Sequence, residues 1–179
     1  MSQNLILVTG CSGGGKTTLI NALDAMGYLT IAEPGRRIVA EQLKGDGAAL
    51  PWVNLRAFAL CAVDMARKDL QKLPASDQPV FFDRGLIDAA VALQFAGGDP
   101  YFQTLGNNKH YAQSVFLAPP WPEIFHQDDE RMHDFSAAEE EYYRIKDALE
   151  ELEYDICLLP KISIEQRVEF VLRSLERNN

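Results

Sequence analysis

A glycine-rich run between an apolar segment and an amphipathic one constrains this chain more than any other feature. The run has the spacing G-x-x-x-x-G-K-[ST] and reads Gly10-Cys11-Ser12-Gly13-Gly14-Gly15-Lys16-Thr17. It follows the short apolar segment Leu5–Val8 and precedes apolar residues at helical spacing between positions 19 and 26. In such a loop the backbone N–H groups point inward around a phosphate, and side chains at the glycine positions would block the approach. The run therefore predicts a site for the phosphates of a nucleotide.

The residue types in this loop also predict how a nucleotide is held. Lys16 is expected to reach the β- and γ-phosphates and the Thr17 hydroxyl to join the shell of a Mg²⁺ ion, while the helix N-terminus adds its dipole. ATP and Mg²⁺ are therefore the expected cofactors. The complete spacing disfavours the alternative, a glycine turn followed by a solvated lysine. The residues expected to contact the nucleotide are Gly10, Ser12, Gly13, Gly14, Gly15, Lys16, Thr17 and Thr18.

Length and charge limit the class of protein. The chain has 179 residues and is 47% apolar, which is enough for one sizeable core and short for two ordinary domains. A single domain over residues 1–179 is expected. The formal net charge is -9, and no segment gathers lysine and arginine into a basic face, which argues against a nucleic-acid partner. A small-molecule partner fits better, and no obligate protein partner is evident.

The cysteines and the first apolar segment indicate a compartment. The three cysteines are scattered and form no C-x-x-C pair, which points to a reducing environment. Leu5–Val8 is too short for a signal sequence or a membrane span. We therefore expect a cytoplasmic protein without a membrane span, in which this segment is a buried strand.

Short apolar runs alternate with longer stretches of helical period, which predicts an α/β protein with parallel strands joined by crossover helices. The expected architecture is a three-layer α/β/α P-loop NTPase fold with a five-stranded parallel sheet. The predicted strands are Leu5–Val8, Tyr28–Ala32, Val80–Asp83, Ser114–Leu117 and Asp155–Leu159. The predicted helices are Lys16–Met26, Gly35–Lys44, Asn54–Leu73, Gly85–Phe95, Ala137–Glu153 and Ile164–Arg177.

Two helices carry further expectations. The third is apolar on most sides, which predicts that it is largely buried or lines a cleft. In the helix from Ala137, the acids Glu139, Glu140 and Glu141 are most simply explained as a solvated face.

Asp83 ends an apolar strand, which is where a P-loop enzyme places the acid that holds Mg²⁺ or its water. Asp83 is therefore the candidate metal ligand beside Thr17, and a candidate catalytic residue. The alternative is that Asp83 caps the helix that begins near Gly85. The two roles are compatible.

The next residue, Arg84, stands where motor-type ATPases carry a glutamate that activates water, and so disfavours that class. Its planar guanidinium fits a phosphate or carboxylate on an acceptor, which makes Arg84 a candidate substrate-binding residue. A local pair with Asp88, one helical turn on, explains it equally well.

Glu33 follows the second predicted strand and so lies at the carboxyl edge of the sheet, where open α/β sheets bind ligands. There it could accept a proton from an attacking hydroxyl or join the outer shell of the metal. The alternative is an acid that the dipole favours at a helix start. Arg36 and Arg37 oppose that dipole, which predicts that at least one of them faces an anion, and Arg36 is a candidate acceptor-binding residue.

The segment 119–135 combines prolines with a charged tip, which predicts a lid. Arg131 is the only arginine in this segment and is the candidate that neutralises the transferring phosphoryl group. An exposed pair with Asp128 or Asp134 is the alternative. Trp52, Phe58, Phe95 and Trp121 are candidates for the wall of an acceptor pocket or for core packing.

The chain resembles the P-loop AAA-type ATPase/kinase-like domains related to the ribosylnicotinamide kinase part of NadR. The resemblance covers nearly the whole length. It is carried by Gly10–Thr17, Asp83–Gly85, Phe116–Trp121, Gln127–Arg131, a tyrosine-rich helix and a last strand that ends in Leu-Leu-Pro. It implies the same fold and nucleotide binding.

A more distant resemblance joins Glu33-Pro34 and Asp83-Arg84 to the signatures of deoxynucleoside and thymidylate kinases. It implies that Glu33 is the base and that Arg84 clamps the acceptor. The chain departs from that pattern at Gly85, where nucleoside kinases often carry serine, and by having one arginine rather than a spaced pair in the lid.

Three functions remain in view. The leading one is a kinase that moves the γ-phosphoryl group of ATP to a small-molecule hydroxyl or phosphate, with a nucleoside-like or nucleotide-like acceptor favoured. The second is a nucleotide-binding switch or slow ATPase that acts through a protein partner. The third, a motor subunit, is disfavoured by Arg84 and by the length of the chain.

Overall fold

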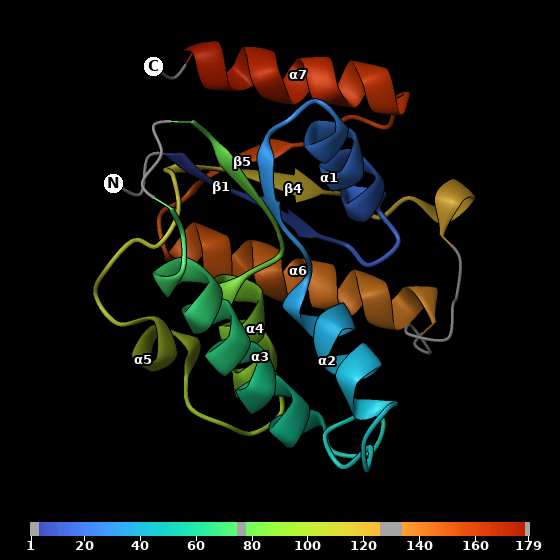
Figure 1. Cartoon of the computed structure of the whole chain (residues 1–179), viewed down its shortest axis with the longest axis vertical. Coiled ribbons are helices and arrows are strands. Elements are labelled where there is room, and N and C mark those ends of the chain that lie inside the picture. The colour runs from blue at the N-terminus through green and yellow to red at the C-terminus, as the bar shows by residue number, and fades with distance from the viewer. Residues whose placement is uncertain (1–3, 75–77, 126–133, 178–179) are drawn as a thin grey trace.

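The computed structural model describes residues 4–74, 78–125 and 134–177, and within these residues five strands form one parallel sheet (Figure 1). The strands are β1 (Leu5–Gly10), β2 (Leu29–Ile31), β3 (Val80–Asp83), β4 (Ser114–Ala118) and β5 (Asp155–Leu158). Their order in the sheet is β2-β3-β1-β4-β5. The predicted five-stranded parallel sheet is confirmed, with β2 shorter and β1 longer than expected.

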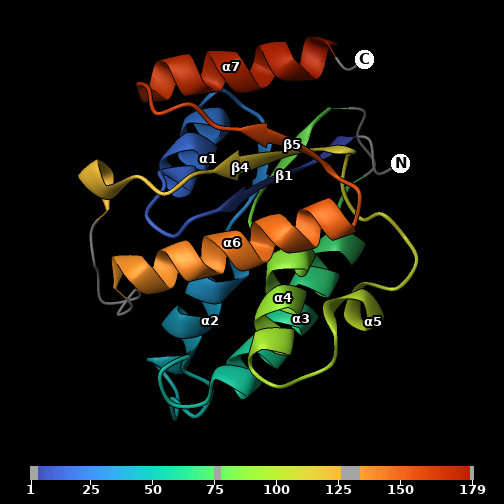
Figure 2. The same ribbon diagram turned by 180° about the vertical axis from the view of Figure 1, so that it is seen from behind.

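Helices cover both faces of this sheet, as Figures 1 and 2 show from opposite sides. Helices α1 and α7 lie on one face, and α3, α4 and α6 lie on the other. The helices are α1 (Lys16–Ala25), α2 (Pro34–Gln42), α3 (Leu55–Gln71), α4 (Leu86–Phe95), α5 (Tyr101–Leu105), α6 (Phe135–Glu151) and α7 (Ile164–Arg177). In the described part of the chain, none of them is long and apolar enough to cross a membrane. The arrangement is the predicted three-layer α/β/α fold.

The apolar strand runs are continuous because each strand contributes to two cores. In β1, Ile6 and Val8 pack with the apolar faces of α1 and α7. Leu7, between them, packs with residues of α3, α4 and α6 on the opposite face. Successive side chains of a strand point to opposite faces, so a sheet covered on both sides needs apolar residues at every position. The sequence pattern and the two-sided burial therefore have the same cause.

The helix starts follow the capping chemistry of the sequence. The Asn54 side chain accepts a hydrogen bond of 3.0 Å from the N–H of Ala57 and begins α3. Ser163 and Gln166 exchange reciprocal bonds of 3.3 Å at the start of α7, which together form a capping box. Helix α5 was not predicted, because five residues are too few to show a helical period.

Helix α3 is not largely buried, but the alternative expectation is confirmed, because Leu55 and Phe58 line a cavity. Its buried face is made of the small residues Ala59, Ala62, Val63 and Ala66 rather than of its largest side chains. Leu60 is exposed instead. Small residues allow α3 to pack closely against α4, so it is the volume of the facing side chains that selects the buried face.

Gly85 is expected to tolerate no side chain, because Tyr111 occupies the space. A Cβ at Gly85 would overlap the Tyr111 hydroxyl and lie 2.9 Å from its Cζ, while that hydroxyl accepts a 2.8 Å bond from the N–H of Leu86. We expect Gly85→Ala to lower the free energy of unfolding by about 1–3 kcal/mol, measured by urea denaturation.

Gly45→Ala is the matched control for this prediction. The nearest atom to a Cβ at Gly45 is 3.6 Å away, and its backbone is not in the left-handed region. We expect this variant to be as stable as the parent or slightly more stable. Equal stability of the two variants would show that Tyr111 moves aside at no cost.

Candidate active site

The glycine-rich run forms a loop over residues 10–17, here called the phosphate loop, between the end of β1 and the first turn of α1. Gly10 and Gly15 have φ of 112° and 80°, a conformation that glycine adopts without strain. A Cβ at Gly10 would also lie 2.7 Å from the backbone N of Ala118 in β4. Glycine is therefore needed both for the turn and for the close approach of the neighbouring strand.

Lys16 is the first residue of α1 and is only 4% exposed. Its Nζ donates hydrogen bonds to the backbone oxygens of Cys11, at 2.7 Å, and Gly10, at 3.4 Å. Burial and, after it, the positive charge of Arg84 lower the pKa of Lys16 to about 8, against the opposing effect of Asp83. The ammonium group thus contacts the first residues of the phosphate loop, where only neutral carbonyl oxygens accept its hydrogen bonds.

This pKa predicts that phosphate binding takes up protons near pH 8. A phosphate beside Lys16 raises the pKa of its amine, so the bound form holds its proton to higher pH than the free form. Affinity for ADP is therefore highest below pH 8 and weakens as the pH rises above it. At pH 8 about half of the free amines are uncharged, so we expect roughly half a proton to be taken up per ADP.

The measurement is calorimetry of ADP binding with EDTA, in buffers of different ionisation enthalpy, at pH 6.5 and pH 8. Proton uptake should be present at pH 8 and nearly absent at pH 6.5. Lys16→Arg is the control, because a guanidinium stays charged at both values and should show no uptake. Wild-type protein that takes up no proton at pH 8 would contradict the lowered pKa.

Asp83 is the last residue of β3 and is buried beside α1. Its Oδ2 accepts a 2.6 Å hydrogen bond from the Thr17 hydroxyl, while its Oδ1 is buried and has no hydrogen-bond partner among the described residues. Burial, and then the charge of Glu33, raises the pKa of Asp83. A buried carboxylate oxygen without a donor, next to a hydroxyl, is the oxygen donor set that Mg²⁺ prefers. The two residues named from the sequence thus fit a Mg²⁺ ion.

The alternative role of Asp83 as a helix cap is not seen. The N–H of Gly85 donates instead to Asp88, at 3.0 Å, and this carboxylate lies in the first turn of α4. Asp88 also accepts a hydrogen bond from the Thr9 hydroxyl of β1. The cap therefore comes from inside the helix, and Asp83 remains directed toward Thr17.

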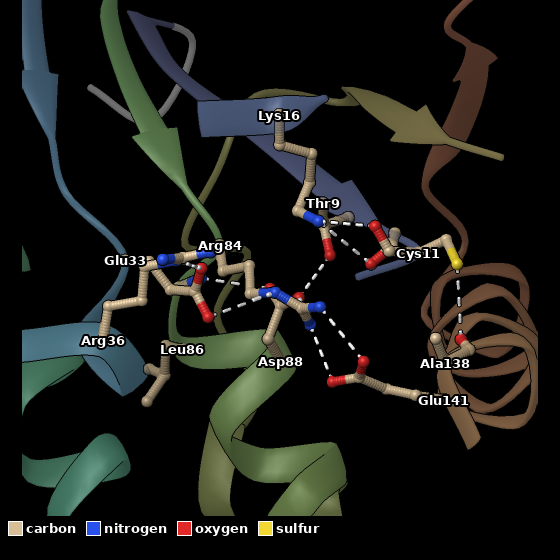
Figure 3. A network of polar contacts seen from close by, with 12 residues as sticks. Thr9, Cys11, Lys16, Glu33, Arg36, Arg84, Leu86, Asp88, Ala138 and Glu141 are labelled. Atoms are coloured by element: carbon tan, nitrogen blue, oxygen red, sulfur yellow. Dashed lines mark hydrogen bonds and ion pairs between the residues drawn. The ribbon is translucent and has the colours of Figure 1, made fainter. Parts of the chain in front are cut away.

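Arg84 lies at the centre of a cluster of three carboxylates, shown in Figure 3. Its guanidinium donates two bonds to Glu141, at 2.9 and 3.1 Å, and one to Asp88, at 3.3 Å. Its Nε lies 3.7 Å from Glu33. Burial alone would lower the pKa of Arg84, but the three acids raise it above its ordinary value. The local pair with Asp88, one of the two alternatives from the sequence, is observed.

The structure corrects the interpretation of the acids on α6. Glu139, Glu140 and Glu141 were expected to form a solvated face, but Glu141 reaches the buried guanidinium of Arg84. The two residues are 57 positions apart. Three consecutive acids carry no signal for which of them turns inward, since that depends on how α6 lies against α4.

Arg36 and Arg37, at the start of α2, both face protein carboxylates. Arg36 lies 3.5 Å from Glu33, and Arg37 donates to Asp69 of α3 at 3.1 Å. The expectation that at least one of these arginines meets an anion is confirmed. Glu33 is the N-terminal cap residue of α2, but its side chain makes no capping bond and turns toward the two arginines, Arg36 and Arg84.

Two cavities adjoin these residues, and Arg36 lines both of them. The first, here called the loop cavity, has a volume of about 400 Å³. It is lined by Gly13, Gly15, Lys16, Thr17, Thr18 and Arg36, among others. The second, here called the aromatic cavity, has a volume of about 450 Å³ and is mostly apolar. Its lining includes Ser12, Glu33, Arg84, Trp52, Phe58 and Phe95.

The aromatic candidates divide between the two cavities. Trp52, Phe58 and Phe95 line the aromatic cavity, whereas Trp121 lines the loop cavity. Trp52 and Phe95 are 43% and 55% exposed, so core packing does not account for them.

Arg167 of α7 is a residue of the site that the sequence analysis missed. It is 2% exposed, lines the loop cavity and donates a 2.7 Å hydrogen bond to the backbone oxygen of Gly14. Its guanidinium also lies 4.7 Å from the ring centre of Trp121. The one signal in the sequence was a charged residue on the apolar face of α7, three residues after Ile164 and one before Val168.

Part of the predicted lid lies outside the described residues. Arg131 is among residues 126–133, so its place in the site remains a prediction. Of the segment 119–135, Pro122–Ile124 form a 3₁₀ turn, and Phe135 is the first residue of α6. Phe125 lies over the phosphate loop, since a Cβ at Gly13 would lie 2.5 Å from its ring. The described part of the segment therefore contacts the loop.

Comparison with solved structures places the fold among those of P-loop kinases. NadR, solved in complex with NR, superposes with a TM-score of 0.70 at 16% identity and covers 98% of this chain, which spans 51% of that protein. Shikimate kinase from Acinetobacter baumannii has a TM-score of 0.62 at 14% identity, covering 99% of this chain and 96% of the kinase. Deoxyadenosine kinase from M. mycoides has a TM-score of 0.61 at 15% identity, covering 98% of this chain and 100% of the kinase. At these identities the likeness concerns the fold.

Sequence comparison gives the family. A "nucleotide-binding protein" of Acidiphilium cryptum (strain JF-5) is 34% identical over 65 residues, which is 36% of this chain and 22% of that protein. The chain thus spans about a fifth of the curated relative that it matches. A family model described as "AAA domain" matches residues 5–167, from the first residue of β1 to Arg167 of α7. The chain belongs to this AAA domain family, and its fold is that of a P-loop NTPase.

Proposed function

We propose that the chain is a phosphotransferase that moves the γ-phosphoryl group of ATP, with Mg²⁺, to a hydroxyl or phosphate of a small molecule. The observation that carries the proposal is the pair of cavities that meet at Arg36. A kinase needs two adjoining sites, one for each substrate, whereas a switch needs only the nucleotide site. The AAA domain family and the fold shared with P-loop kinases support this proposal.

The loop cavity is the proposed nucleotide site. The phosphate loop surrounds the phosphates with backbone N–H groups, and Lys16 leaves the carbonyls of Gly10 and Cys11 to contact the β- and γ-phosphates. Thr17 and Asp83 would hold Mg²⁺, the first with its hydroxyl and the second with its buried carboxylate. When bound, Mg²⁺ would offset the negative charge of the phosphates and align the terminal one.

The aromatic cavity is the proposed acceptor site, with Glu33 as the base. The acceptor oxygen attacks the γ-phosphorus, and where this oxygen belongs to a hydroxyl, Glu33 takes its proton. A new O–P bond forms, the bond from phosphorus to the bridging oxygen breaks, and ADP leaves with the electron pair. Arg36 faces both cavities and offsets the charge that develops between them. Arg84 acts on the acceptor through the three carboxylates that it holds in place.

The segment 119–135 is the proposed lid of a single P-loop domain over residues 1–179. Its described part already contacts the phosphate loop through Phe125. Arg131 is proposed to reach the transferring phosphoryl group when the lid covers the loop cavity, where a positive charge stabilises the transition state.

The test is transfer of label from γ-labelled ATP with Mg²⁺ to a panel of acceptors. The panel contains nucleosides, nucleoside monophosphates, ribosylnicotinamide, and sugar or lipid hydroxyls, and Lys16→Ala is the blank. Transfer that is lost in Lys16→Ala and strongly reduced in Glu33→Gln supports the proposal. Tight nucleotide binding with slow hydrolysis and no transfer to any acceptor would refute it and favour a switch.

A further inference from the structure

The arginines of the aromatic cavity are already paired with carboxylates of the protein. Among the described residues three arginines line it, and each lies within 4 Å of an acid: Arg36 of Glu33 at 3.5 Å, Arg84 of Glu141 at 2.9 Å, and Arg144 of Glu140 at 3.9 Å. Arg84, the most buried of them, is held by three acids at once.

The acids around Arg84 leave this end of the cavity rich in hydrogen-bond acceptors. Glu33, Asp88 and Glu141 all line the cavity, and these three carboxylates outnumber the two guanidiniums beside them, those of Arg84 and Arg36. A phosphate or carboxylate placed there would meet like charges, or would have to break a buried ion pair to reach Arg84. Hydroxyl groups, in contrast, can donate to carboxylate oxygens.

The opposite wall of the cavity is apolar and aromatic. Trp52 and Phe58 come from the start of α3 and the turn before it, Phe95 comes from the end of α4, and the three meet around the same space. Phe95 is 55% exposed, and the guanidinium of Arg144 lies 3.8 Å from its ring centre. Exposed aromatic rings beside a hollow of this size provide faces for stacking a planar group.

We propose that the acceptor is a nucleoside-like alcohol: a planar ring that bears a hydroxylated sugar and carries no phosphate or carboxylate. This inference rests on the proposed function and deepens it, because it selects a hydroxyl rather than a phosphate as the acceptor. The hydroxylated end lies at Glu33, Asp88 and Glu141, and the ring lies against Phe58 and Phe95. The product, a phosphate monoester, places new negative charge beside these acids, which favours its release.

The test compares acceptors that differ by one phosphate. The common nucleosides and deoxynucleosides, together with ribosylnicotinamide, are each assayed beside their 5′-monophosphates with γ-labelled ATP and Mg²⁺. For the best nucleoside we expect kcat/KM to exceed that of its monophosphate by about 100-fold. Preferred transfer to a monophosphate, to a carboxylate-bearing alcohol or to a sugar that bears no planar ring would overturn this inference while leaving the proposed function intact. Transfer to nothing would overturn the proposed function itself.

Two variants test the two ends of the cavity. Glu141→Gln removes one of the acids that hold Arg84, so the preference for the nucleoside over its monophosphate should fall by about 10-fold. Asp147→Asn, an exposed acid on the same helix, is the control and should leave the preference unchanged. An unchanged preference in Glu141→Gln, with the fold intact by circular dichroism, contradicts the role given to the acids.

Phe95→Ala removes one stacking face at the other end. We expect KM for the nucleoside to rise by about 10-fold with kcat and the KM for ATP nearly unchanged. Phe102→Ala is the matched control, since Phe102 is equally exposed and is not part of the aromatic cavity. An equal effect of both variants, or a fall in kcat alone, would show that the ring does not lie on Phe95.

Discussion

Replacing Asp83 by asparagine is expected to lower the rate of phosphoryl transfer by about two to three orders of magnitude. The asparagine side chain would keep an oxygen that accepts the 2.6 Å bond from Thr17, but it loses the negative charge that would hold Mg²⁺. A bound metal ion contributes several kcal/mol to the transition state of such reactions. The measurement is kcat with γ-labelled ATP over a range of Mg²⁺ concentrations, and the loss should be only partly recovered at high Mg²⁺.

Stability separates this effect from misfolding. Asparagine keeps the shape of the side chain and removes a buried charge, so we expect the free energy of unfolding to stay within about 1 kcal/mol of the wild type. Asp155→Asn, at an exposed strand start, is the control and should change neither property. A wild-type rate in Asp83→Asn would remove Asp83 from the metal site.

The pH dependence of the wild type gives a second check on Asp83. Burial, followed by the charge of Glu33, raises the pKa of this carboxyl. Mg²⁺ binds the ionised form, so the apparent affinity for Mg²⁺ should be full at high pH and be lost as the pH falls through the raised pKa. This loss should begin at a higher pH than for an exposed aspartate, and it should be absent in Asp83→Asn.

Replacing Arg84 by methionine is expected to destabilise the fold by about 3–5 kcal/mol, the largest stability effect predicted for this chain. Methionine fills part of the volume but leaves Glu33, Asp88 and Glu141 without the cation that they share. Asp88 is buried, and burial already raises its pKa. Urea denaturation at pH 8 measures the loss.

The loss should shrink as the pH falls. Without Arg84 the buried carboxyl of Asp88 has a higher pKa in the folded state than in the unfolded chain, so the folded state binds its proton more tightly and gains stability on acidification. Arg144→Met is the control, because its pair with Glu140 is partly exposed and should be worth no more than about 1 kcal/mol. A loss in Arg84→Met that equals that of Arg144→Met at every pH would show that the cluster adds nothing to stability.

Arg84→Lys tests how far the geometry of the guanidinium matters. Lysine keeps the charge but cannot donate the two parallel bonds that Arg84 makes with Glu141. We expect a stability between those of the wild type and Arg84→Met. Arg84 also has a φ of 58°, in the left-handed region, and all three side chains share this cost, so it cancels from the comparison.

The sequence predicted the sheet because its signals are local. Continuous apolar runs mark strands that are buried on both faces. The run Gly10–Thr17 predicts both the conformation of the loop and the start of the helix that follows it. The position of Asp83 at the end of an apolar strand was enough to predict a place beside the phosphate loop, because parallel strands end at one edge.

The partners of Arg84 and the place of Arg167 could not be read in the same way. Glu141 is 57 positions from Arg84, and the oxygen of Gly14 is 153 positions from Arg167. Which of three consecutive acids meets a buried arginine depends on the rotation of α6 against α4, and that rotation is decided by side-chain volumes in the core. Local patterns carry no information about it.

The sequence by itself determined the class of fold, the phosphate loop and the strand ends at which Glu33 and Asp83 stand, since each follows from periodicity and spacing within about twenty residues. Tertiary structure alone decided which charges are paired, that Arg36 faces both cavities, and that Phe95 meets the distant residues Trp52 and Phe58 around one space. The physical reason is that the pairing of charged side chains and the shape of a cavity arise where elements distant in the sequence pack together. The packing energy depends on both contacting surfaces, so no single segment of the sequence determines it.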